Sequence, residues 1–95
     1  RGSASPGRCS CYTGGGTTST GAKAAFGRVA VNPSIIPYGT ELYICSPDGE
    51  LVYGYAVAAD TGGAAMRGAI IADLYYDSYS QCMKIGTRTM NVYIL

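Results

Sequence analysis

The sequence predicts a mainly β domain: a small closed barrel of about six strands with one or more short helices. Three observations support this fold class. Short apolar segments rich in Val, Ile and Tyr alternate with Gly, Pro and Asn turns, as strands and their connections do. The loops are long for a hairpin sandwich, and one segment alone has convincing helix signals. The 95 residues suit one domain over residues 1–95.

Six segments are predicted as strands. They lie at residues 8–13, 28–31, 40–45, 51–59, 70–75 and 87–95. Asn32-Pro33 ends the second strand, because proline cannot donate to a strand ladder. Pro47-Asp48-Gly49 has the composition of a turn between the third and fourth strands. The polar opening, residues 1–7, is expected to be flexible or vector-derived.

One helix is predicted just before the last strand. Ser78 and Gln81 fit a capping box, and Gly86 can end the helix. Tyr79, Cys82 and Met83 are expected to form its apolar face. Single helical turns are expected at residues 33–36 and 64–66.

Composition excludes several classes of protein. Hydrophobic residues make up 47% of the chain, which is too apolar for a disordered segment. No apolar run is long enough to cross a membrane, so no membrane insertion is expected. The net charge is +1 with scattered Lys and Arg, which argues against a nucleic-acid partner. Histidine is absent, which excludes Ser-His-Asp and Cys-His catalysis and every histidine metal site.

The four cysteines predict disulfide bonds and an oxidising compartment. Cys9 and Cys11 point to the same face if both lie on one strand, so neither is placed to bond the other. Each is expected to pair with one of Cys45 and Cys82, in either arrangement. The alternative is a four-thiolate zinc site. Zinc sites usually use paired cysteine knuckles, and Cys45 and Cys82 are single, so no metal is predicted.

Without histidine, acid–base chemistry depends chiefly on six acidic residues. Four of them have structural explanations, in a turn, on the surface or at the helix start: Glu41, Asp48, Glu50 and Asp77. Asp60 ends an almost uncharged strand, and Asp73 lies among apolar residues. Burial is expected to raise the pKa of Asp73, as a general acid requires. The alternative is that Asp73 only accepts hydrogen bonds inside the barrel.

Tyrosines gather around this region of the sequence. Tyr75, Tyr76 and Tyr79 follow Asp73 closely, and Tyr53 and Tyr55 are expected to share one face of the strand that leads to Asp60. Tyrosine rings stack on sugars and donate hydrogen bonds, although they are also common as half-buried strand residues. The cluster favours a carbohydrate or a similar polar ligand.

The segments around these residues resemble a known family, the three-aspartate (3D) domain. They are Val29–Thr40 (VAVNPSIIPYGT), Ala59–Ala64 (ADTGGA), Ala72–Tyr75 (ADLY) and Gly86–Leu95 (GTRTMNVYIL). The resemblance runs from about Thr20 to the last residue. It implies a six-stranded double-psi β-barrel, as found in stationary-phase survival proteins and lytic transglycosylase A.

The resemblance also implies a function in the bacterial cell wall. Such enzymes cleave the β-1,4 bond between N-acetylmuramic acid and N-acetylglucosamine without water and leave 1,6-anhydro ends. One aspartate acts first as acid and then as base, and no cofactor is needed. The implied partners are peptidoglycan glycan strands and, in the full-length protein, other cell-wall-binding domains. The implied location is secreted or wall-associated, in Gram-positive bacteria or their phages.

The family motif assigns roles residue by residue. Asp73 matches the catalytic acid/base and Asp60 the aspartate that tunes it. The implied substrate-binding residues are Asn32, Thr61, Gly62, Gly63 and Tyr75, with Thr20, Gly21 and Lys23 reaching in from the N-terminal loop. Two features depart from the family pattern: Asn32 stands where an aspartate is usual, and the link from Asp60 to Asp73 is slightly long. Two other functions therefore stay open, a glycan-binding module without catalysis and a structural barrel that binds no sugar.

Overall fold

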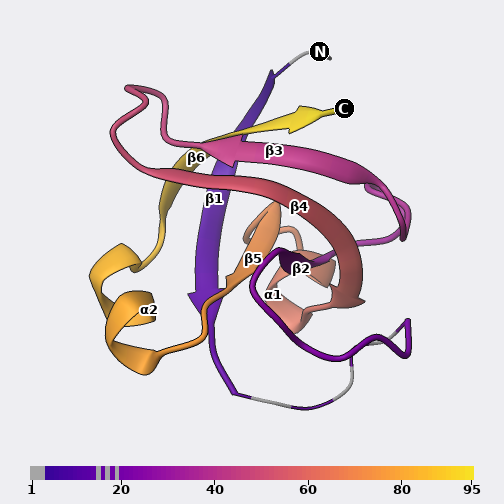
Figure 1. Ribbon diagram of the computed structural model, residues 1–95. Coiled ribbons are helices and arrows are strands. Elements are labelled where there is room, and N and C mark those ends of the chain that lie inside the picture. The colour runs from indigo at the N-terminus through magenta and orange to yellow at the C-terminus, as the bar shows by residue number, and fades with distance from the viewer. Residues whose placement is uncertain (1–3, 15, 17, 19) are drawn as a thin grey trace.

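The structure, a computed structural model, describes residues 4–14, 16, 18 and 20–95 (Figure 1). Six strands and two short helices follow one another along the chain. They are β1 (Ala4–Tyr12), β2 (Arg28–Val31), β3 (Glu41–Cys45), β4 (Val52–Thr61), α1 (Gly63–Met66), β5 (Ala72–Tyr75), α2 (Tyr79–Ile85) and β6 (Arg88–Ile94). Neither helix is long and apolar enough to cross a bilayer within the described part of the chain.

The strands form one closed barrel in the order β1-β5-β2-β4-β3-β6, and β6 pairs again with β1. The β1/β5 and β2/β4 pairs are parallel, while the other four are antiparallel. Parallel pairs need crossover connections, which explains the long loops between consecutive strands. The predicted fold class, a six-stranded double-psi β-barrel, is confirmed.

The predicted strands agree with the structure except at the start of the chain. β1 begins at Ala4, and its residues 4–7 pair with residues 90–93 of β6. The expectation that residues 1–7 are flexible is therefore wrong for residues 4–7, while residues 1–3 lie outside the described residues. Pro6 and Gly7 obscure this part of the strand in the sequence, because both residues are rare in strands.

The predicted helix is α2, and its two ends form as expected. The Ser78 hydroxyl accepts a hydrogen bond from the Gln81 backbone N–H at 3.2 Å, and Gly86 ends the helix at φ 59°. Its expected apolar face is wrong, because only Cys82 is buried while Tyr79 and Met83 are 68% and 62% exposed. A helix of seven residues that packs on the barrel through Cys82 and the half-buried Ile85 leaves most of its surface in solvent. α1 accounts for the turn predicted at residues 64–66.

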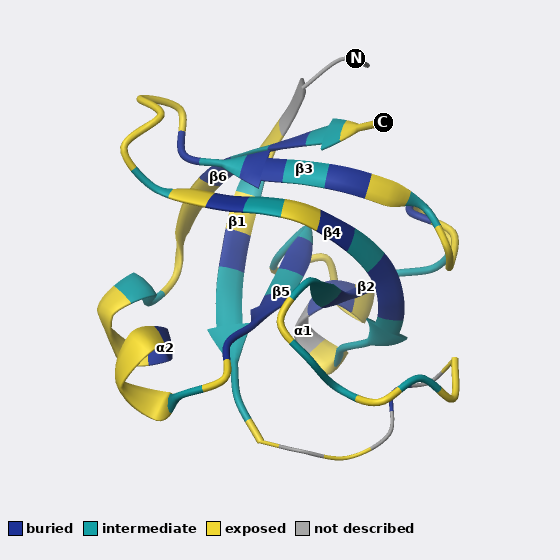
Figure 2. Ribbon diagram, in the orientation of Figure 1, coloured by how far each residue is buried: buried dark blue, intermediate teal, exposed yellow. Residues whose placement is uncertain are grey.

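The core fills the barrel interior with mainly aliphatic side chains, and Figure 2 shows the buried residues as dark blue bands along the strands. Its largest fully buried members are Leu42, Ile44, Leu74, Met90, Val29, Val31 and Val92. Aromatic rings pack beside this core: Tyr53 stacks on Phe26 at 4.4 Å and meets the edge of Tyr76 at 5.3 Å. The Tyr53 hydroxyl accepts from Gly27 N–H at 2.8 Å and donates to the Tyr75 carbonyl at 2.7 Å. This hydroxyl thus joins β4 to β5 and to the segment before β2.

A bulge in β4 separates two tyrosines that were expected on one face. The β3/β4 register moves from Ile44 opposite Gly54 to Cys45 opposite Val52, so Tyr53 is the extra residue. Gly54 takes φ 94°, which a residue with a side chain rarely adopts. Tyr53 therefore turns inward, at 4% exposed, and Tyr55 outward, at 54% exposed. Strict alternation fails because a bulge adds one residue to the count.

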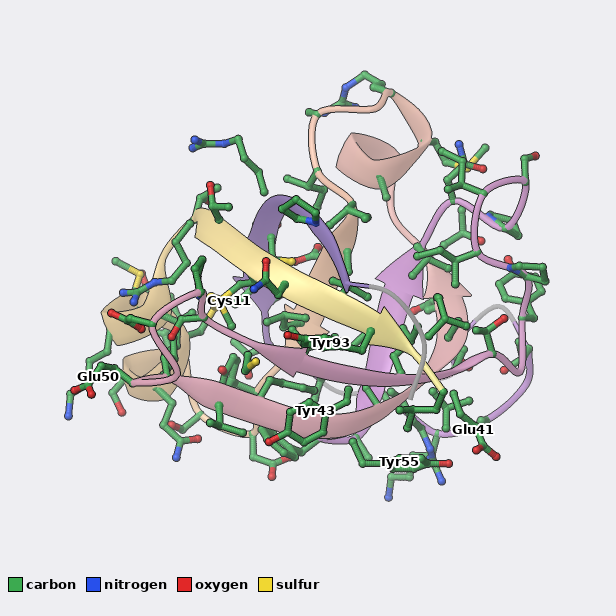
Figure 3. All side chains as sticks on the ribbon, turned by 90° about the horizontal axis from the view of Figure 1, so that it is seen from above. Cys11, Glu41, Tyr43, Glu50, Tyr55 and Tyr93 are labelled. Carbon is green, nitrogen blue, oxygen red and sulfur yellow. A yellow bond between two sulfur atoms is a disulfide. The ribbon has the colours of Figure 1, made fainter. Side chains whose placement is uncertain are left out.

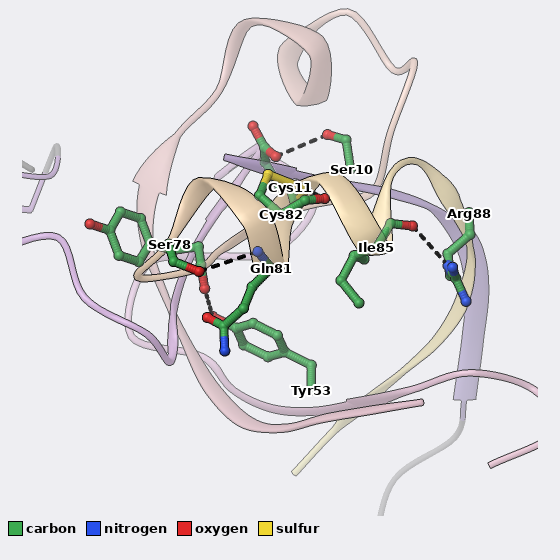
Figure 4. The surroundings of a disulfide bond; sticks show 10 residues. Ser10, Cys11, Tyr53, Ser78, Gln81, Cys82, Ile85 and Arg88 are labelled. Atoms are coloured by element: carbon green, nitrogen blue, oxygen red, sulfur yellow. Dashed lines mark hydrogen bonds between the residues drawn. A yellow bond between two sulfur atoms is a disulfide. The ribbon is translucent and has the colours of Figure 1, made fainter. Parts of the chain in front are cut away.

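One of the two expected disulfides is present: Cys11 of β1 is bonded to Cys82 of α2 (Figure 4). The expected second bond is wrong, because Cys9 and Cys45 are free thiols. β6 lies between β1 and β3, with Cys9 opposite its residue Arg88 and Cys45 opposite its residue Asn91. Two strand spacings of ~4.8 Å put Cys9 and Cys45 beyond the reach of a disulfide.

Candidate active site

The two candidate aspartates lie on one side of the barrel, in a row that crosses four adjacent strands. Ser10 of β1 is opposite Asp73 of β5, and Asp73 is opposite Ala30 of β2. Ala30 is in turn opposite Asp60 of β4. Two strand spacings separate the Asp60 and Asp73 backbones by about 10 Å, with only the small Ala30 side chain between them. The fold therefore brings together residues from four separate parts of the chain.

Asp73 is a half-buried carboxylate at the β5 position of this row. The Ser10 hydroxyl donates a hydrogen bond to its Oδ1 at 2.9 Å, next to the disulfide (Figure 4). Burial raises the pKa of Asp73 above its usual value, and the Ser10 hydrogen bond opposes this only in part. A carboxyl with a raised pKa keeps its proton to a higher pH, as a general acid must.

The raised pKa of Asp73 predicts a specific pH dependence of stability. The folded protein holds this proton more tightly than the unfolded chain does, so ionisation of Asp73 favours unfolding. The contribution of Asp73 to the free energy of unfolding is therefore complete below the unfolded pKa of ~3.9 and is lost as pH rises through the folded value. We expect urea unfolding of the parent, compared with Asp73→Asn between pH 3 and 8, to show the parent losing stability relative to the variant over that window. A constant difference across all pH values would contradict the raised pKa.

Asp60 is held at the end of β4 by a second bulge. The β2/β4 register moves from Val29 opposite Ala58 to Ala30 opposite Asp60, so Ala59 is the extra residue. Ala59 stays buried while Asp60 comes to lie in line with Ala30 and Asp73. The carboxylate Oδ1 of Asp60 also accepts a hydrogen bond from the backbone N–H of Thr61 at 2.8 Å.

Gly62 lies directly beside Asp73. A Cβ at this position would be 3.9 Å from Asp73 Oδ2 and 3.4 Å from the Ala30 Cβ. The absence of a side chain at Gly62 and the small side chain of Ala30 therefore leave the Asp73 carboxylate room for a ligand. Gly62 has φ −118°, so this position needs a glycine for space and not for its backbone conformation.

Alanine at position 62 is expected to weaken the site without harming the fold. The added methyl fits at ordinary contact distances but stands over the Asp73 carboxylate. We expect Gly62→Ala to lower glycan affinity about tenfold in a titration with peptidoglycan fragments, as loss of ~1.4 kcal/mol of contact would do. Gly63→Ala is the comparison, because the family motif implies a binding role for both glycines, whereas a methyl at Gly63 would meet only the end of the Arg67 side chain, at 3.3 Å, and not Asp73. Equal losses in the two variants would show that Gly62 does not border the ligand.

The N-terminal loop reaches the end of β4 through Thr20. Its backbone N–H and its hydroxyl both donate to the Ala59 carbonyl, at 3.3 and 2.9 Å, and Thr18 Oγ1 lies 3.0 Å from Thr20 Oγ1. Thr20 is thereby fixed one residue from Asp60. Gly21 donates its N–H to the Thr18 carbonyl in the same turn. Lys23 is exposed.

The other residues assigned by the family motif have varied surroundings. Thr61 Oγ1 forms a hydrogen bond with the Tyr38 hydroxyl. Asn32 Oδ1 accepts from the Ser34 N–H at 2.9 Å, which stabilises the turn after β2. Gly63 begins α1 next to Arg67. Tyr75 is 6% exposed, and its ring packs edge-on against Tyr12 at 5.2 Å, so it offers a ligand almost no surface.

The tyrosines do not form the expected cluster around Asp73. Tyr53, Tyr75 and Tyr76 are buried among other rings, and Tyr79 is exposed on α2. Tyr55 lies with Tyr43 and Tyr93 in a cross-strand row over β4, β3 and β6 (Figure 3). The sequence places tyrosines near Asp73 along the chain, but alternation and the β4 bulge send them to different sides of the barrel.

A shallow hollow of about 400 Å³ includes neither aspartate in its lining. Its lining consists of Pro6, Gly7, Arg8, Ile35, Gly68, Ala69, Ile70 and Ile71. Arg8 is the only titratable residue in this lining, so the hollow has no acid for catalysis. No group of three or more potential metal ligands occurs in the described part of the chain.

Ser10, Ala30 and Tyr38 are site residues that the sequence reasoning missed. Ser10 is 63 residues from Asp73, and only the parallel β1/β5 pairing joins them. Alternation along β1 was the available signal, since the buried Cys9 predicts that Ser10 faces outward. No sequence signal identified the strand that would lie beside it.

A closed mixed barrel with two in-register aspartates defines the class of this protein, a small barrel domain with an acidic site on its wall. The chain belongs to the 3D domain family, which matches residues 27–95. The family resemblance predicted from the sequence is confirmed. β1, which supplies Ser10, precedes the matched residues.

Two relatives come from Bacillus subtilis (strain 168). The chain is 36% identical over 67 residues to "Putative cell wall shaping protein YabE" and 39% identical over 67 residues to "Cell wall-binding protein YocH". Each match covers 70% of this chain but only 14% and 21% of the respective relative. The chain thus spans a minor part of the length of these relatives. No solved structure matches the chain.

Proposed function

We propose that this domain is a lytic transglycosylase that cleaves the glycan strands of peptidoglycan between N-acetylmuramic acid and N-acetylglucosamine. The observation that carries the proposal is the state of Asp73: a half-buried carboxyl with a raised pKa, in register with a second aspartate and open to a ligand beside Gly62. Membership of the 3D domain family supports the choice of substrate.

In this proposal Asp73 performs both proton transfers. The protonated carboxyl donates its proton to the glycosidic oxygen as the bond from that oxygen to C1 of the muramic acid residue breaks. The resulting carboxylate then takes the proton of the C6 hydroxyl, whose oxygen bonds to C1 and closes the 1,6-anhydro ring. Asp73 is again protonated at the end, and no water is consumed. Asp60 places a second negative charge near the site, suited to stabilising positive charge that develops on the sugar.

A location outside the cytoplasm is part of the proposal. The Cys11–Cys82 disulfide favours an oxidising compartment, and both relatives are named for the cell wall. Because those relatives are several times longer than the match, we propose that this domain works beside others that bind the wall.

A second candidate function is glycan binding without cleavage, and Asn32 favours it. The family usually has an aspartate there, whereas Asn32 is uncharged and its oxygen is occupied by the Ser34 N–H. One relative is named as a binding protein. A binding module would need the same open site beside Gly62 but no proton transfer from Asp73.

Product analysis separates these functions. Purified peptidoglycan is incubated with the domain, and the soluble products are identified by mass spectrometry. Muropeptides with 1,6-anhydro ends are expected from a lytic transglycosylase, whereas reducing ends would identify a hydrolase. If the domain sediments with the wall but releases no product, glycan binding is the function. If it neither binds nor cleaves, the barrel has a structural role.

A further inference from the structure

Tyr12 ends β1 with a buried hydroxyl that nothing satisfies. Its oxygen is the one buried side-chain polar atom without a hydrogen-bond partner in the described part of the chain. Buried hydroxyls are expensive to leave unpaired, and an unsatisfied one in a folded protein calls for an explanation, of which a catalytic role is one. The Tyr53 hydroxyl, in the same aromatic region, shows the usual outcome, because it has both a donor and an acceptor.

The strand geometry sets Tyr12 beside the aspartate row. Tyr12 is two residues after Ser10, so it leaves β1 on the same side as the hydroxyl that binds Asp73. Its register partner is Tyr75, two residues after Asp73, and the two rings pack edge-on at 5.2 Å. This contact fixes the ring, and only the hydroxyl lacks an interaction.

The charged groups that act on this hydroxyl are the two site aspartates. Burial is the main cause that raises the pKa of Tyr12 to about 12, and the charges of Asp60 on β4 and Asp73 on β5 contribute to this value, with a smaller effect from Tyr75. Tyr53 is the other titratable group that interacts with Tyr12. The phenol therefore stays protonated at any physiological pH and can only donate to these carboxylates.

We propose that Tyr12 is a positioning residue for the Asp60–Asp73 pair: its hydroxyl has no partner while the site is protonated, and donates to the carboxylate once the proton has left. The donor then stabilises the anionic state that must form after the acid step. In this proposal the Ser10 hydroxyl donates to Asp73 whether the carboxyl is protonated or ionised, whereas the Tyr12 hydroxyl donates only to the ionised form. The inference deepens the proposed function, but the hydrogen bond itself can be measured without any substrate.

Carboxyl titration of Tyr12→Phe tests this role. The variant removes one oxygen and keeps the ring that packs on Tyr75. Loss of a hydrogen bond to a charged group is expected to raise the pKa of Asp73 or Asp60 by about one unit, followed through the carboxyl carbon signals in NMR. Tyr55→Phe is the matched control, because Tyr55 is 54% exposed on the outer side of β4 and should leave both pKa values unchanged.

Stability and activity give independent outcomes. At a pH low enough to keep the site protonated, Tyr12→Phe is expected to unfold at the same temperature as the parent or higher, because there it removes an unsatisfied group. If cleavage is detected, the alkaline limb of its pH profile should move upward by the same unit. Unchanged carboxyl pKa values, or a Tyr12→Phe variant that is clearly less stable while the site is protonated, would overturn the proposal for Tyr12. If the domain cleaves nothing but Tyr12→Phe still shifts the carboxyl pKa, the proposed reaction is rejected, while the proposed hydrogen bond from Tyr12 is supported.

Discussion

Replacing Asp73 by asparagine is expected to abolish release of anhydro-muropeptides while the domain still folds and still sediments with peptidoglycan. Asparagine keeps the size of the side chain and can still accept the Ser10 hydrogen bond, so the β1/β5 contact survives. It cannot give up or take a proton at the glycosidic bond. General acid–base groups contribute about 10²- to 10⁴-fold to rate, and in the proposed reaction one carboxyl performs both transfers. We therefore expect at least that loss in the initial rate of product release, measured by mass spectrometry.

Asp77→Asn is the matched control for this experiment. Asp77 is exposed just before α2, outside the aspartate row, so the same loss of one charge should leave the rate unchanged. Asp60→Asn should give an intermediate loss, since Asp60 contributes charge but no proton in the proposed reaction. Cleavage that persists in Asp73→Asn would reject the assignment of Asp73 as the acid, whatever the effect at Asp60.

The strands could be predicted because their signals are local. Asn32-Pro33 stops β2 and Pro47-Asp48-Gly49 turns the chain between β3 and β4, so these ends follow from backbone chemistry at a few residues. The two β4 bulges could not be predicted in the same way. Tyr53 and Ala59 become extra residues only because β4 must curve between β3 and β2. The wrong expectation that the two tyrosines of β4 share one face comes from that curvature.

The candidate site, like the strands, could be predicted only where its residues carry a local signal in the sequence. Asp60 and Asp73 stand out in the sequence because a carboxylate beside apolar residues is costly unless it has a purpose. Ser10 and Tyr12 carry no such mark, since serine and tyrosine are common on half-buried strands. Their relation to the aspartates depends on parallel pairing of β1 with β5 across more than sixty residues of chain. The family match begins at residue 27, after β1, and therefore could not supply them either.

For the cysteines, side-chain alternation along one strand was a sound guide, but the number of disulfides depends on which strands are neighbours in the barrel. Alternation correctly kept Cys9 and Cys11 apart from each other, and the structure pairs Cys11 with Cys82. Cys9 instead points into the core at 1% exposed, where burial raises the pKa of its thiol to about 12 and makes it unreactive. An even number of cysteines thus predicted one bond too many.

Removal of the Cys11–Cys82 bond is expected to cost this domain much of its stability. The bond joins residues 71 apart, and the loop-closure entropy of such a link is worth about 4 kcal/mol. A domain of this size has only ~5–15 kcal/mol in total. The bond also holds α2 to β1, where Cys82 is the sole buried residue of the helix. We expect the double variant Cys11→Ser, Cys82→Ser to unfold about 20 °C below the parent in a thermal melt.

Cys45→Ala is the control, because Cys45 is a free, half-buried thiol whose removal leaves the bond intact. Thiol titration of the denatured parent should find two free thiols before reduction and all four cysteines after it. A parent with no free thiols would mean that Cys9 and Cys45 do bond, which the two strand spacings across β6 forbid without opening the barrel.

Because Cys11 lies between Ser10 and Tyr12 on β1, loss of the bond should also loosen the strand that carries both donors. The double variant should then lose its site at temperatures where the rest of the barrel is still folded.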